Sequence, residues 1–420
     1  MALNLSTLTN PATSGGILAE ALTTADFLDP VPILKNLSRG SNKGGDAKQT
    51  TGLNQPRALP LIKNPSGNLG GYLYIPDVSG NYATGPSVTI GSNQTWQGEL
   101  DMVVTQWGAV GEYVLPMGGG QWDEGFGVIF YNDGFVRMFS KGGMSGVVTY
   151  NNSGVTFGTP FNVKYGFDGA NIYVDIDDTR VYTLTAPSQS GSITHNLQLH
   201  QQTLTNQGNY AIQKAKLTVN SAVVFDCDFN GSTSIRHGDT KFQASVGGPV
   251  VLTKAGNDPI TVVKKSVLRF STATSGLKGL FANQTNGGYM FAAFSVLGTG
   301  GPAGETNGRI FSVNKTGDVD YGNGGAVFSF RMGTTNTLRS YNEVQIITHD
   351  GLYDDTNGDI LHQIKITQGS QLSKINNADL GTTTLTQPVE FDEFNIGQNE
   401  DGIRSYGQNA AIDLEYLALF

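Results

Sequence analysis

Hydrophobic and polar residues alternate with a period of two along most of the chain from Tyr72 onward, which is typical of half-buried β-strands. In the stretch FGVIFYNDGFVRMFS, the side chains of Phe126, Val128 and Phe130 share one face of a strand. The residues Asn132 to Gly134 then form a turn signal before a returning strand. Short strands of this kind, separated by Gly- and Asn-rich turns, predict an antiparallel β-sandwich or barrel.

The first 66 residues follow a different pattern, because only here do apolar residues recur at helical spacing. The motif Asp29 to Pro32 would end such a helix, since proline lacks a backbone N–H group. We therefore expect one short helix near the N-terminus, followed by extended chain. The helical positions are Ile17, Leu18, Ala21, Leu22 and Ala25.

Basic residues are concentrated in the same region, although the formal net charge of the chain is -9. Between Pro30 and Lys63, Asp46 is the single acidic residue. An extended basic stretch on an acidic protein indicates an arm that orders against a partner; a solvated or disordered linker is the alternative. The residues expected to contact the partner are Ile17, Leu18, Leu22, Lys35, Arg39, Lys43, Lys48 and Arg57.

The β-rich part of the sequence reads as two similar halves. The early strands ELDMVVTQWG and YMFAAFSVLG both end in glycine, and each half closes with a strand, a polar Gly/Asn loop and a final strand. We therefore expect four segments. They are the N-terminal arm (1–66), a first sandwich (67–232), a hairpin-like connector (233–265) and a second sandwich (266–420).

A family resemblance rests on two stretches of sequence. The stretch YLYIPDVSGNYATGPSVTIGSNQTWQGELDMVV, which begins at Tyr72, resembles the opening of the concanavalin A-like, laminin-G-type jelly rolls found in tailed-phage virion proteins. The passage from Asn395-Ile396-Gly397 to IDLEYLALF is similar to the last strands of that family. The resemblance implies two tandem concanavalin A-like sandwiches behind an N-terminal attachment region, and fold alone does not fix function.

What the resemblance implies about function is a structural role in a phage particle. The arm would bind other virion proteins of the head or tail, and the sandwiches would be displayed outward as capsid decoration or a short tail fibre. We expect a homo-oligomer, with a trimer as the expected form, made in the host cytoplasm and located in the virion. The alternatives are a receptor-binding tail fibre that recognises host glycan, and a free lectin or glucanase.

The glucanases of this fold class carry three acidic residues on one strand, because retaining hydrolysis needs a nucleophile and an acid/base on either side of the sugar. Glu99 and Asp101 supply the first two positions, but Val103 and Val104 occupy both places that the third could take. Glu390 to Phe394 is a second partial match that also lacks the last glutamate. We therefore predict that the protein is not an enzyme.

Two acidic clusters are candidate sites for a structural Ca²⁺ ion, because Ca²⁺ prefers clustered oxygen ligands. No other cofactor is expected. Turn formation alone also explains such clusters. The first cluster comprises Asp175, Asp177 and Asp178. The second lies in HDGLYDDTNGD, with Asp354, Asp355, Asn357 and Asp359 as its candidate ligands.

Three tryptophans, Trp96, Trp107 and Trp122, lie close together in sequence and are candidates for glycan contact, with sandwich core as the competing interpretation. Cys227 is the single cysteine, so no intrachain disulfide is available, and its place among alternating residues predicts a buried side chain. Nucleic-acid binding is not expected, because the basic residues are not interleaved with aromatic ones. Neither a secretory signal nor a membrane span is expected.

Overall fold

The fold was analysed in a computed structural model of the chain. The described residues are 15–17, 33–34, 47–48, 56–106, 113–120, 125–131, 135–140, 150–151, 155, 158–185, 191–200, 208–255, 258–270, 276–284, 287–296, 307–315, 327–332, 337–342, 345–349, 360–367, 369–376, 378–384, 391–396 and 412–419. Within these ranges the regular structure is entirely β, which confirms the predicted all-β class. None of these ranges contains a helix suited to crossing a membrane.

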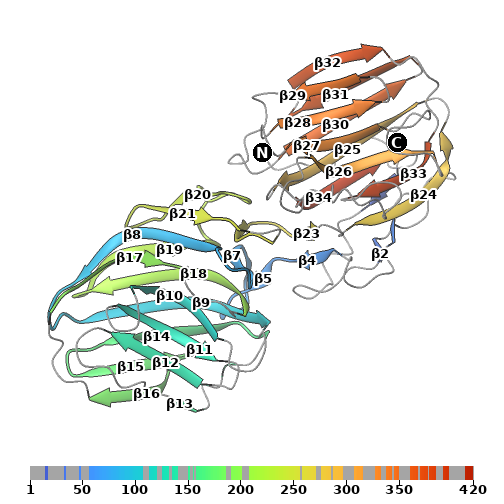
Figure 1. Ribbon diagram of the computed structural model, residues 1–420. Helices are drawn as coiled ribbons and strands as arrows, with labels where there is room; N and C mark the ends of the chain where they lie inside the picture. The colour runs from blue at the N-terminus through green and yellow to red at the C-terminus, as the bar shows by residue number, and fades with distance from the viewer. Residues whose placement is uncertain are drawn as a thin grey trace. The chain divides into compact units, whose positions relative to one another are not determined.

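The chain divides into two compact units. Residues Leu61–Lys265 form one unit, which we call the first sandwich. Met1–Pro60 together with Ser266–Phe420 form the other, the second sandwich, so the N-terminal region is grouped with the C-terminal part of the chain. Figure 1 shows the strands of each unit under the labels used below.

The first sandwich consists of two eight-stranded antiparallel sheets. The β9 sheet has the order β16 (Thr179–Thr185), β15 (Asn171–Ile176), β14 (Phe161–Phe167), β9 (Trp96–Gln106), β18 (Asn209–Val219), β7 (Tyr72–Ile75) and β22 (Thr261–Val263), and β19 (Ala222–Asp228) also pairs with β18. The β10 sheet has the order β13 (Tyr150–Asn151), β12 (Phe135–Ser140), β11 (Phe126–Tyr131), β10 (Tyr113–Gly119), β17 (Ile193–Gln198), β8 (Tyr82–Ile90), β21 (Pro249–Thr253) and β20 (Lys241–Gln243). A two-stranded hairpin, β5 (Ile62–Lys63) with β6 (Leu69–Gly70), belongs to the same unit.

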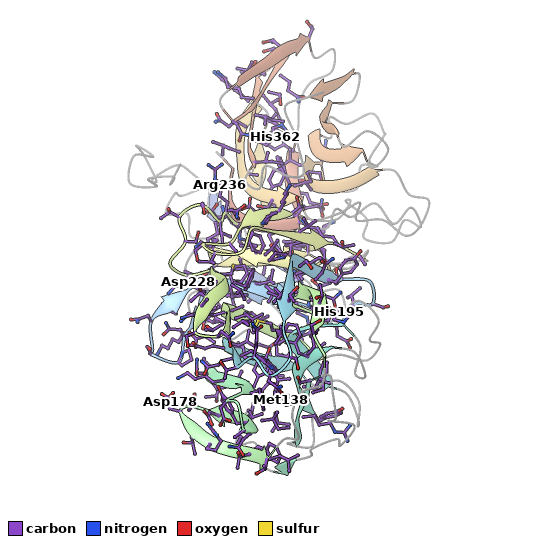
Figure 2. All side chains as sticks on the ribbon, turned by 90° about the vertical axis from the view of Figure 1, so that its left-hand side faces the viewer. Met138, Asp178, His195, Asp228, Arg236 and His362 are labelled. Carbon is purple, nitrogen blue, oxygen red and sulfur yellow. The ribbon has the colours of Figure 1, made fainter. Side chains whose placement is uncertain are left out.

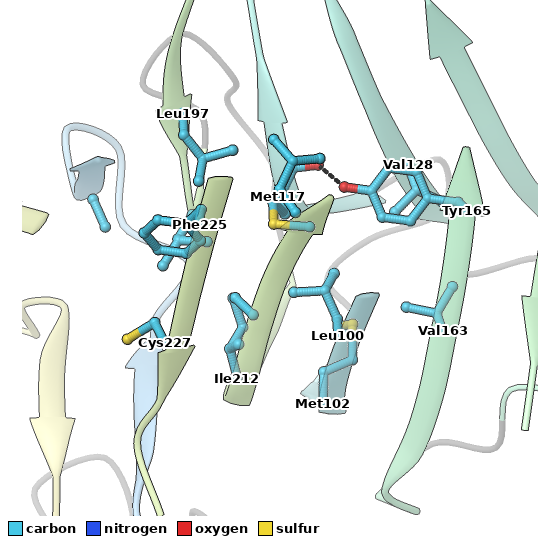
Figure 3. Close-up of a cluster of buried hydrophobic side chains, with 14 of the residues drawn as sticks. Leu100, Met102, Met117, Val128, Val163, Tyr165, Leu197, Ile212, Phe225 and Cys227 are labelled. Atoms are coloured by element: carbon cyan, nitrogen blue, oxygen red, sulfur yellow. Dashed lines mark hydrogen bonds between the residues drawn. The ribbon is translucent and has the colours of Figure 1, made fainter. Parts of the chain in front are cut away.

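One hydrophobic core joins these two sheets. On β9, Leu100, Met102 and Val104 point inward, and they share a cluster with Met117 of β10 and Val128 of β11. Figure 3 shows part of this cluster, with side chains from both sheets meeting between them. On strands such as β14 and β21, the period of two reflects one buried and one more exposed face, whereas β7, β11 and β22 are buried on both faces.

The second sandwich also consists of two eight-stranded antiparallel sheets. The β25 sheet has the order β32 (Ala378–Thr384), β31 (Ser370–Ile375), β30 (Ile360–Thr367), β25 (Gly287–Val296), β34 (Ile412–Leu419), β23 (Val267–Phe270) and β4 (Arg57–Leu59), and β1 (Gly15–Ile17) also pairs with β34. The β26 sheet has the order β29 (Gln345–His349), β28 (Thr337–Asn342), β27 (Val327–Met332), β26 (Asn307–Asn314), β33 (Phe391–Ile396), β24 (Leu277–Gln284), β3 (Ala47–Lys48) and β2 (Ile33–Leu34).

The two sandwiches have the same strand order, strand for strand. Strands β7 to β18 of the first correspond in sequence order to β23 to β34 of the second. The remaining four places are filled differently: β19 to β22 follow β18 in the chain, whereas their counterparts β1 to β4 come from the N-terminal region. We call β1 to β4 the N-terminal quartet and β19 to β22 the internal quartet.

The N-terminal region differs from the expected helix and free arm. Ile17, the first residue of the expected helix, ends strand β1 and is opposite Leu417 of β34. Arg57 begins β4, opposite Arg269 of β23. These segments are extended because pairing with strands of the same chain satisfies their backbone N–H and C=O groups. Leu18 and Leu22 of the expected helix lie outside the described residues.

The segment expected as a connector, 233–265, is instead part of the first sandwich. Strands β20 and β21 extend the β10 sheet, and β22 extends the β9 sheet next to β7. This segment joins the first sandwich because its apolar residues Val250, Leu252 and Val262 are buried in the core of that unit.

Candidate functional site

The acidic pair on β9 lies on the outer face of its sheet. A Glu99 carboxylate oxygen is 3.6 Å from Lys214 Nζ on the neighbouring strand β18. Asp101 Oδ1 accepts a hydrogen bond of 2.7 Å from the amide of Asn162 on β14. Val103, at the next outward position of the strand, is 3% exposed. The two acids are therefore held by neighbouring strands.

The same face carries a row of charges that alternate in sign from strand to strand. Each member is directly opposite the next in the antiparallel registers. Opposite charges in such positions attract across the strands and stabilise the sheet modestly. In order across β19, β18, β9, β14, β15 and β16, the row is Asp226, Lys216, Glu99, Lys164, Asp175 and Arg180.

This arrangement does not suit glycoside hydrolysis. A retaining enzyme needs one carboxyl group with a raised pKa as proton donor and a second carboxylate facing it across the substrate. Glu99 is directly opposite Lys164 on β14 and Lys216 on β18, so basic side chains flank it on both neighbouring strands. Glu99 and Asp101 are thus part of a sheet face on which acidic side chains are held by basic and amide groups of the neighbouring strands.

The first predicted Ca²⁺ cluster is a turn whose carboxylates point to different partners. Asp177 and Asp178 have positive φ angles of 48° and 60°, as a tight hairpin turn between β15 and β16 requires. Asp177 Oδ1 accepts a hydrogen bond of 2.9 Å from the Asn162 backbone N–H, and Asp178 accepts one of 2.5 Å from Lys164 Nζ. Figure 2 labels Asp178 among the side chains of the first sandwich. The hydrogen bond to Asp178 raises the pKa of Lys164.

Asp175, the third member of that cluster, is paired with Arg180. The Arg180 guanidinium also lies over the Tyr173 ring, 4.1 Å from its centroid. Across the residues that the structure describes, there is no cluster of three or more His, Cys, Asp or Glu side chains suited to a metal ion. The second predicted cluster, Asp354, Asp355, Asn357 and Asp359, lies outside the described residues.

Trp96 belongs to the core and is not available for glycan stacking. Its side chain is 2% exposed, and its ring meets Phe126 and Tyr165 edge to face at centroid distances of 5.4 Å and 5.9 Å. Such aromatic packing buries a large apolar area between the sheets. The prediction of a glycan contact at Trp96 is therefore wrong, while Trp107 and Trp122 lie outside the described residues.

Cys227 is buried on β19 beside Phe225, as the alternation predicted (Figure 3). Burial raises the pKa of its thiol to about 12. Because the thiolate is the reactive form, this side chain is a small apolar filler and not a nucleophile.

Polar groups that the sequence did not reveal tie the two sheets of the first sandwich together. Tyr165 donates a hydrogen bond of 2.9 Å to the Met117 carbonyl oxygen, and Tyr210 donates one of 3.2 Å to the Leu115 carbonyl oxygen. Both acceptors lie on β10 beside an irregularity in its pairing with β11, between Val114 and Met117. A bulge of this kind leaves carbonyl groups outside the ladder, and two buried phenols satisfy them.

His200 extends this interior network. Its Nδ1 is 2.8 Å from the Tyr210 hydroxyl oxygen, and the residue is 3% exposed with a φ angle of 126°. Burial lowers the pKa of His200 to about 3, so the ring is neutral at physiological pH. A positive φ in a non-glycine residue is strained, so the surrounding packing holds His200 in place. No sequence signal distinguished this histidine from the other four.

Lys264, in the segment expected as a connector, binds backbone carbonyls of the turn that follows β19. Its Nζ donates hydrogen bonds to the carbonyl oxygens of Phe229 at 2.5 Å and Ser232 at 2.9 Å, and a longer one to Asn230 at 3.4 Å. Partial burial lowers the pKa of this ammonium group. Lys264 therefore acts as an internal cation that fixes the turn.

Among the described residues, the second sandwich buries polar side chains at positions that are aliphatic in the first. His362 Nε2 is 3.0 Å from Ser373 Oγ, and both side chains are fully buried. Gln371 is also fully buried, and neither atom of its side-chain amide has a hydrogen-bond partner. In the matching strand pairs of the first sandwich, these three positions are aliphatic. The counterparts of His362, Ser373 and Gln371 are Val163, Val174 and Ile172.

The basic residues of the expected arm are only partly described. Lys48 lies in β3, opposite Lys278 of β24, and Arg57 lies in β4, opposite Arg269 of β23. Arg269 in turn makes a two-pronged ion pair with Asp413 of β34, with both distances at 2.8 Å and both side chains fully buried. Lys35, Arg39 and Lys43 lie outside the described residues, in the stretch between β2 and β3.

Comparison with known proteins leaves the family open. No family model matches the sequence, and no curated protein matches it. Among solved structures, domains LG4-5 of the mouse laminin alpha1 chain are 10% identical, cover 86% of this chain and 91% of their own, and give a TM-score of 0.29. The LG1-3 region of the laminin alpha2 chain is 12% identical over 81% of this chain and 61% of its own, with a TM-score of 0.27.

Two glycosidases give similar figures. A fructofuranosidase from Schwanniomyces occidentalis is 7% identical, covers 70% of this chain and 77% of its own, and gives a TM-score of 0.25. The Trypanosoma rangeli sialidase is 8% identical over 72% of this chain and 59% of its own, with a TM-score of 0.28. At TM-scores this low, we base the description of the fold on the strand order alone.

Proposed function

We propose that this protein is a non-enzymatic structural component of a tailed-phage virion, bound to the head or tail through its basic N-terminal region. The two sandwiches would form the displayed body, as decoration or as a short fibre. This proposal is supported by the resemblance of the stretch from Tyr72 to phage concanavalin A-like domains. The observation that carries its non-enzymatic part is the arrangement on β9, where Glu99 and Asp101 are held by Lys214 and Asn162.

The pairing of the N-terminal strands supports a more specific proposal for where attachment would occur. Strands β1 to β4 belong to the sheets of the second sandwich, so these described parts of the N-terminal region are not a free arm. Lys35, Arg39 and Lys43 fall between β2 and β3, the last two strands at one edge of the β26 sheet. A basic connection at a sheet edge suits an acidic partner surface, because opposite charges steer and hold the encounter. We place the contact with other virion proteins there.

Glycan recognition is the competing function. Of its three candidate contact residues, Trp96 is buried in the core and cannot reach a glycan. Receptor binding would then depend on Trp107 and Trp122. A full-length Trp107→Ala/Trp122→Ala variant that loses adhesion to host cells, while entering particles normally, would favour this second function.

The test of attachment uses charge reversal, because deletion of residues 1–60 would remove strands from the second sandwich. Full-length protein with Lys35→Glu, Arg39→Glu and Lys43→Glu should be incorporated into particles at a small fraction of the normal copy number. The matched control reverses Lys63 and Lys241, which are exposed on β5 and β20 of the first sandwich. Normal copy number for the triple variant would refute the proposed attachment.

A further inference from the structure

The two quartets are arranged reciprocally along the chain. The N-terminal quartet directly precedes the strands of the first sandwich but completes the second, where β4 pairs with β23 and β3 pairs with β24. The internal quartet precedes the strands of the second sandwich but completes the first, where β22 pairs with β7 and β21 with β8. In a domain-swapped dimer, two protomers exchange identical strands in this way. Here the two units that exchange their quartets belong to a single chain.

Among the described residues, two of the three ladders that join the N-terminal quartet to its acceptor strands are shorter than their counterparts in the internal quartet. Strand β1 runs beside β34 over Leu417–Leu419, whereas β19 runs beside β18 over Lys214–Val219. Strand β3 is paired with β24 at one described position, Lys48 opposite Lys278, whereas β21 runs beside β8 over Tyr82–Thr84. The ladders of β4 with β23 and of β22 with β7 are equal in length.

Release of the N-terminal quartet would expose strand edges on β23, on β24 and along Leu417–Leu419 of β34. An edge of this kind presents unpaired N–H and C=O groups, and an added strand gains main-chain hydrogen bonds. The quartet of a second copy would make the same contacts as the quartet of the same chain. The balance between the two therefore depends on protein concentration and on the connection at Pro60–Leu61, where the chain passes between units.

We propose that β23 and β24 form a strand-acceptor edge for a second copy of this chain, whose N-terminal quartet completes the second sandwich. Copies would then assemble by mutual strand donation. This inference does not depend on a role in the virion, because it concerns only contacts between copies of the chain.

The test uses single cysteine substitutions on two differently tagged full-length copies. One copy carries Ala58→Cys on β4 and the other Leu268→Cys on β23, which are directly opposite in the register. Opposite positions on antiparallel strands have a Cα separation that suits a disulfide. The matched control uses Leu73→Cys and Val262→Cys, the opposite middle positions of β7 and β22. The buried Cys227 stays in place, because burial raises its thiol pKa to about 12.

After co-expression and mild oxidation, the test copies should give a covalent dimer at a yield at least about tenfold above the control copies, because only strand donation between chains joins them. A single chain with both Ala58→Cys and Leu268→Cys reports whether the geometry closes a disulfide at all. If it closes within one chain while mixed copies give no dimer above the control, the proposal is wrong. If it does not close, the native mass of the unsubstituted protein decides: a multiple of 44.6 kDa supports the proposal, and a lone monomer overturns it.

Discussion

Tyr165 on β14 donates a 2.9 Å hydrogen bond to the carbonyl oxygen of Met117 on β10, so one phenol spans the two sheets of the first sandwich (Figure 3). The donor is fully buried. Burial also raises the pKa of Tyr165 far above its ordinary value, so the phenol keeps its proton. A buried carbonyl without a partner is costly, and this bond removes that cost at the irregular part of β10.

Replacement of Tyr165 by Phe should therefore lower the free energy of unfolding of the first sandwich by about 1–3 kcal/mol, because the Met117 carbonyl stays buried without its donor. Tryptophan fluorescence during urea unfolding measures this unit selectively, since all three tryptophans lie between Trp96 and Trp122. Tyr182→Phe, at a half-buried position on β16, is the control and should change little. An equal loss in both variants would contradict the proposed role of the hydrogen bond.

His200 should make the first sandwich less stable in mild acid. Its folded-state pKa is about 3, below the value of about 6.5 expected for an unfolded histidine, so the unfolded chain binds the extra proton first. Stability is fully present above pH 6.5 and should fall by up to about 1.4 kcal/mol per pH unit as the pH drops toward 3. Urea unfolding at pH 7.5, 6 and 5 measures the slope.

The matched variant for this pH effect is His200→Gln, which removes the titrating ring. It should be less stable at pH 7.5 but should show a much smaller loss between pH 6.5 and 4.5. Asp168 does not affect this window strongly, because hydrogen bonds from Asn171 and Ala170 lower its pKa and move its contribution to more acidic conditions. An unchanged slope in the variant would exclude His200 as the source.

The buried ion pair between Arg269 and Asp413 should respond very differently to single and double substitution. Asp413→Ala leaves a buried guanidinium without its carboxylate and should cost the second sandwich about 3–5 kcal/mol. Arg269→Met combined with Asp413→Leu should cost far less, because no buried charge remains. Hydrogen exchange of peptides from β34 reports on this unit, which contains no tryptophan.

An exposed pair provides the comparison for that experiment. Asp175→Ala breaks the pair with Arg180, whose side chain is 45% exposed, and should cost the first sandwich no more than about 1 kcal/mol. Similar losses for Asp413→Ala and Asp175→Ala would show that the interior pair carries no special weight.

Gln371 offers a stabilising substitution. Its amide is fully buried with no hydrogen-bond partner, so Gln371→Leu should raise the stability of the second sandwich by about 1–2 kcal/mol. Hydrogen exchange of peptides from β30 and β31 measures the gain. Ile172→Gln at the matching position of the first sandwich should have the opposite effect, measured by tryptophan fluorescence. A loss of stability in Gln371→Leu would show that the amide has a role that the contacts do not reveal.

The alternation of hydrophobic and polar residues predicted which segments form β-strands. It did not predict which part of the chain supplies the outer strands of each sheet. The alternation around Phe126 and Cys227 located buried faces well, because a strand in a sandwich core must alternate. Ile17 was misjudged because one apolar residue fits a helix and a short strand equally well, and pairing with β34 decides between them. Such pairing joins residues about 400 positions apart, which no local pattern encodes.

The candidate site was harder to predict for a similar reason. The sequence placed Glu99 and Asp101 on one strand, but Lys214 and Asn162 reach them from strands far along the chain. Trp96 is in the core because its position on β9 faces Phe126 and Tyr165. The strained His200 had no signal in the sequence, because its role depends on Tyr210, whose hydroxyl also donates a hydrogen bond to the Leu115 carbonyl oxygen.

The second sandwich is completed by strands β1 to β4 from the start of the chain, so it cannot fold fully until synthesis is nearly finished. All strands of the first sandwich lie within one continuous stretch, Leu61–Lys265, so this unit has its full set of strands while the ribosome is still translating. The quartet emerges first yet meets β34 only after Ile412–Leu419 has been made. During that interval the nascent protein carries unmatched strands at its leading end, where chaperones and sister polypeptides on the same messenger compete for them.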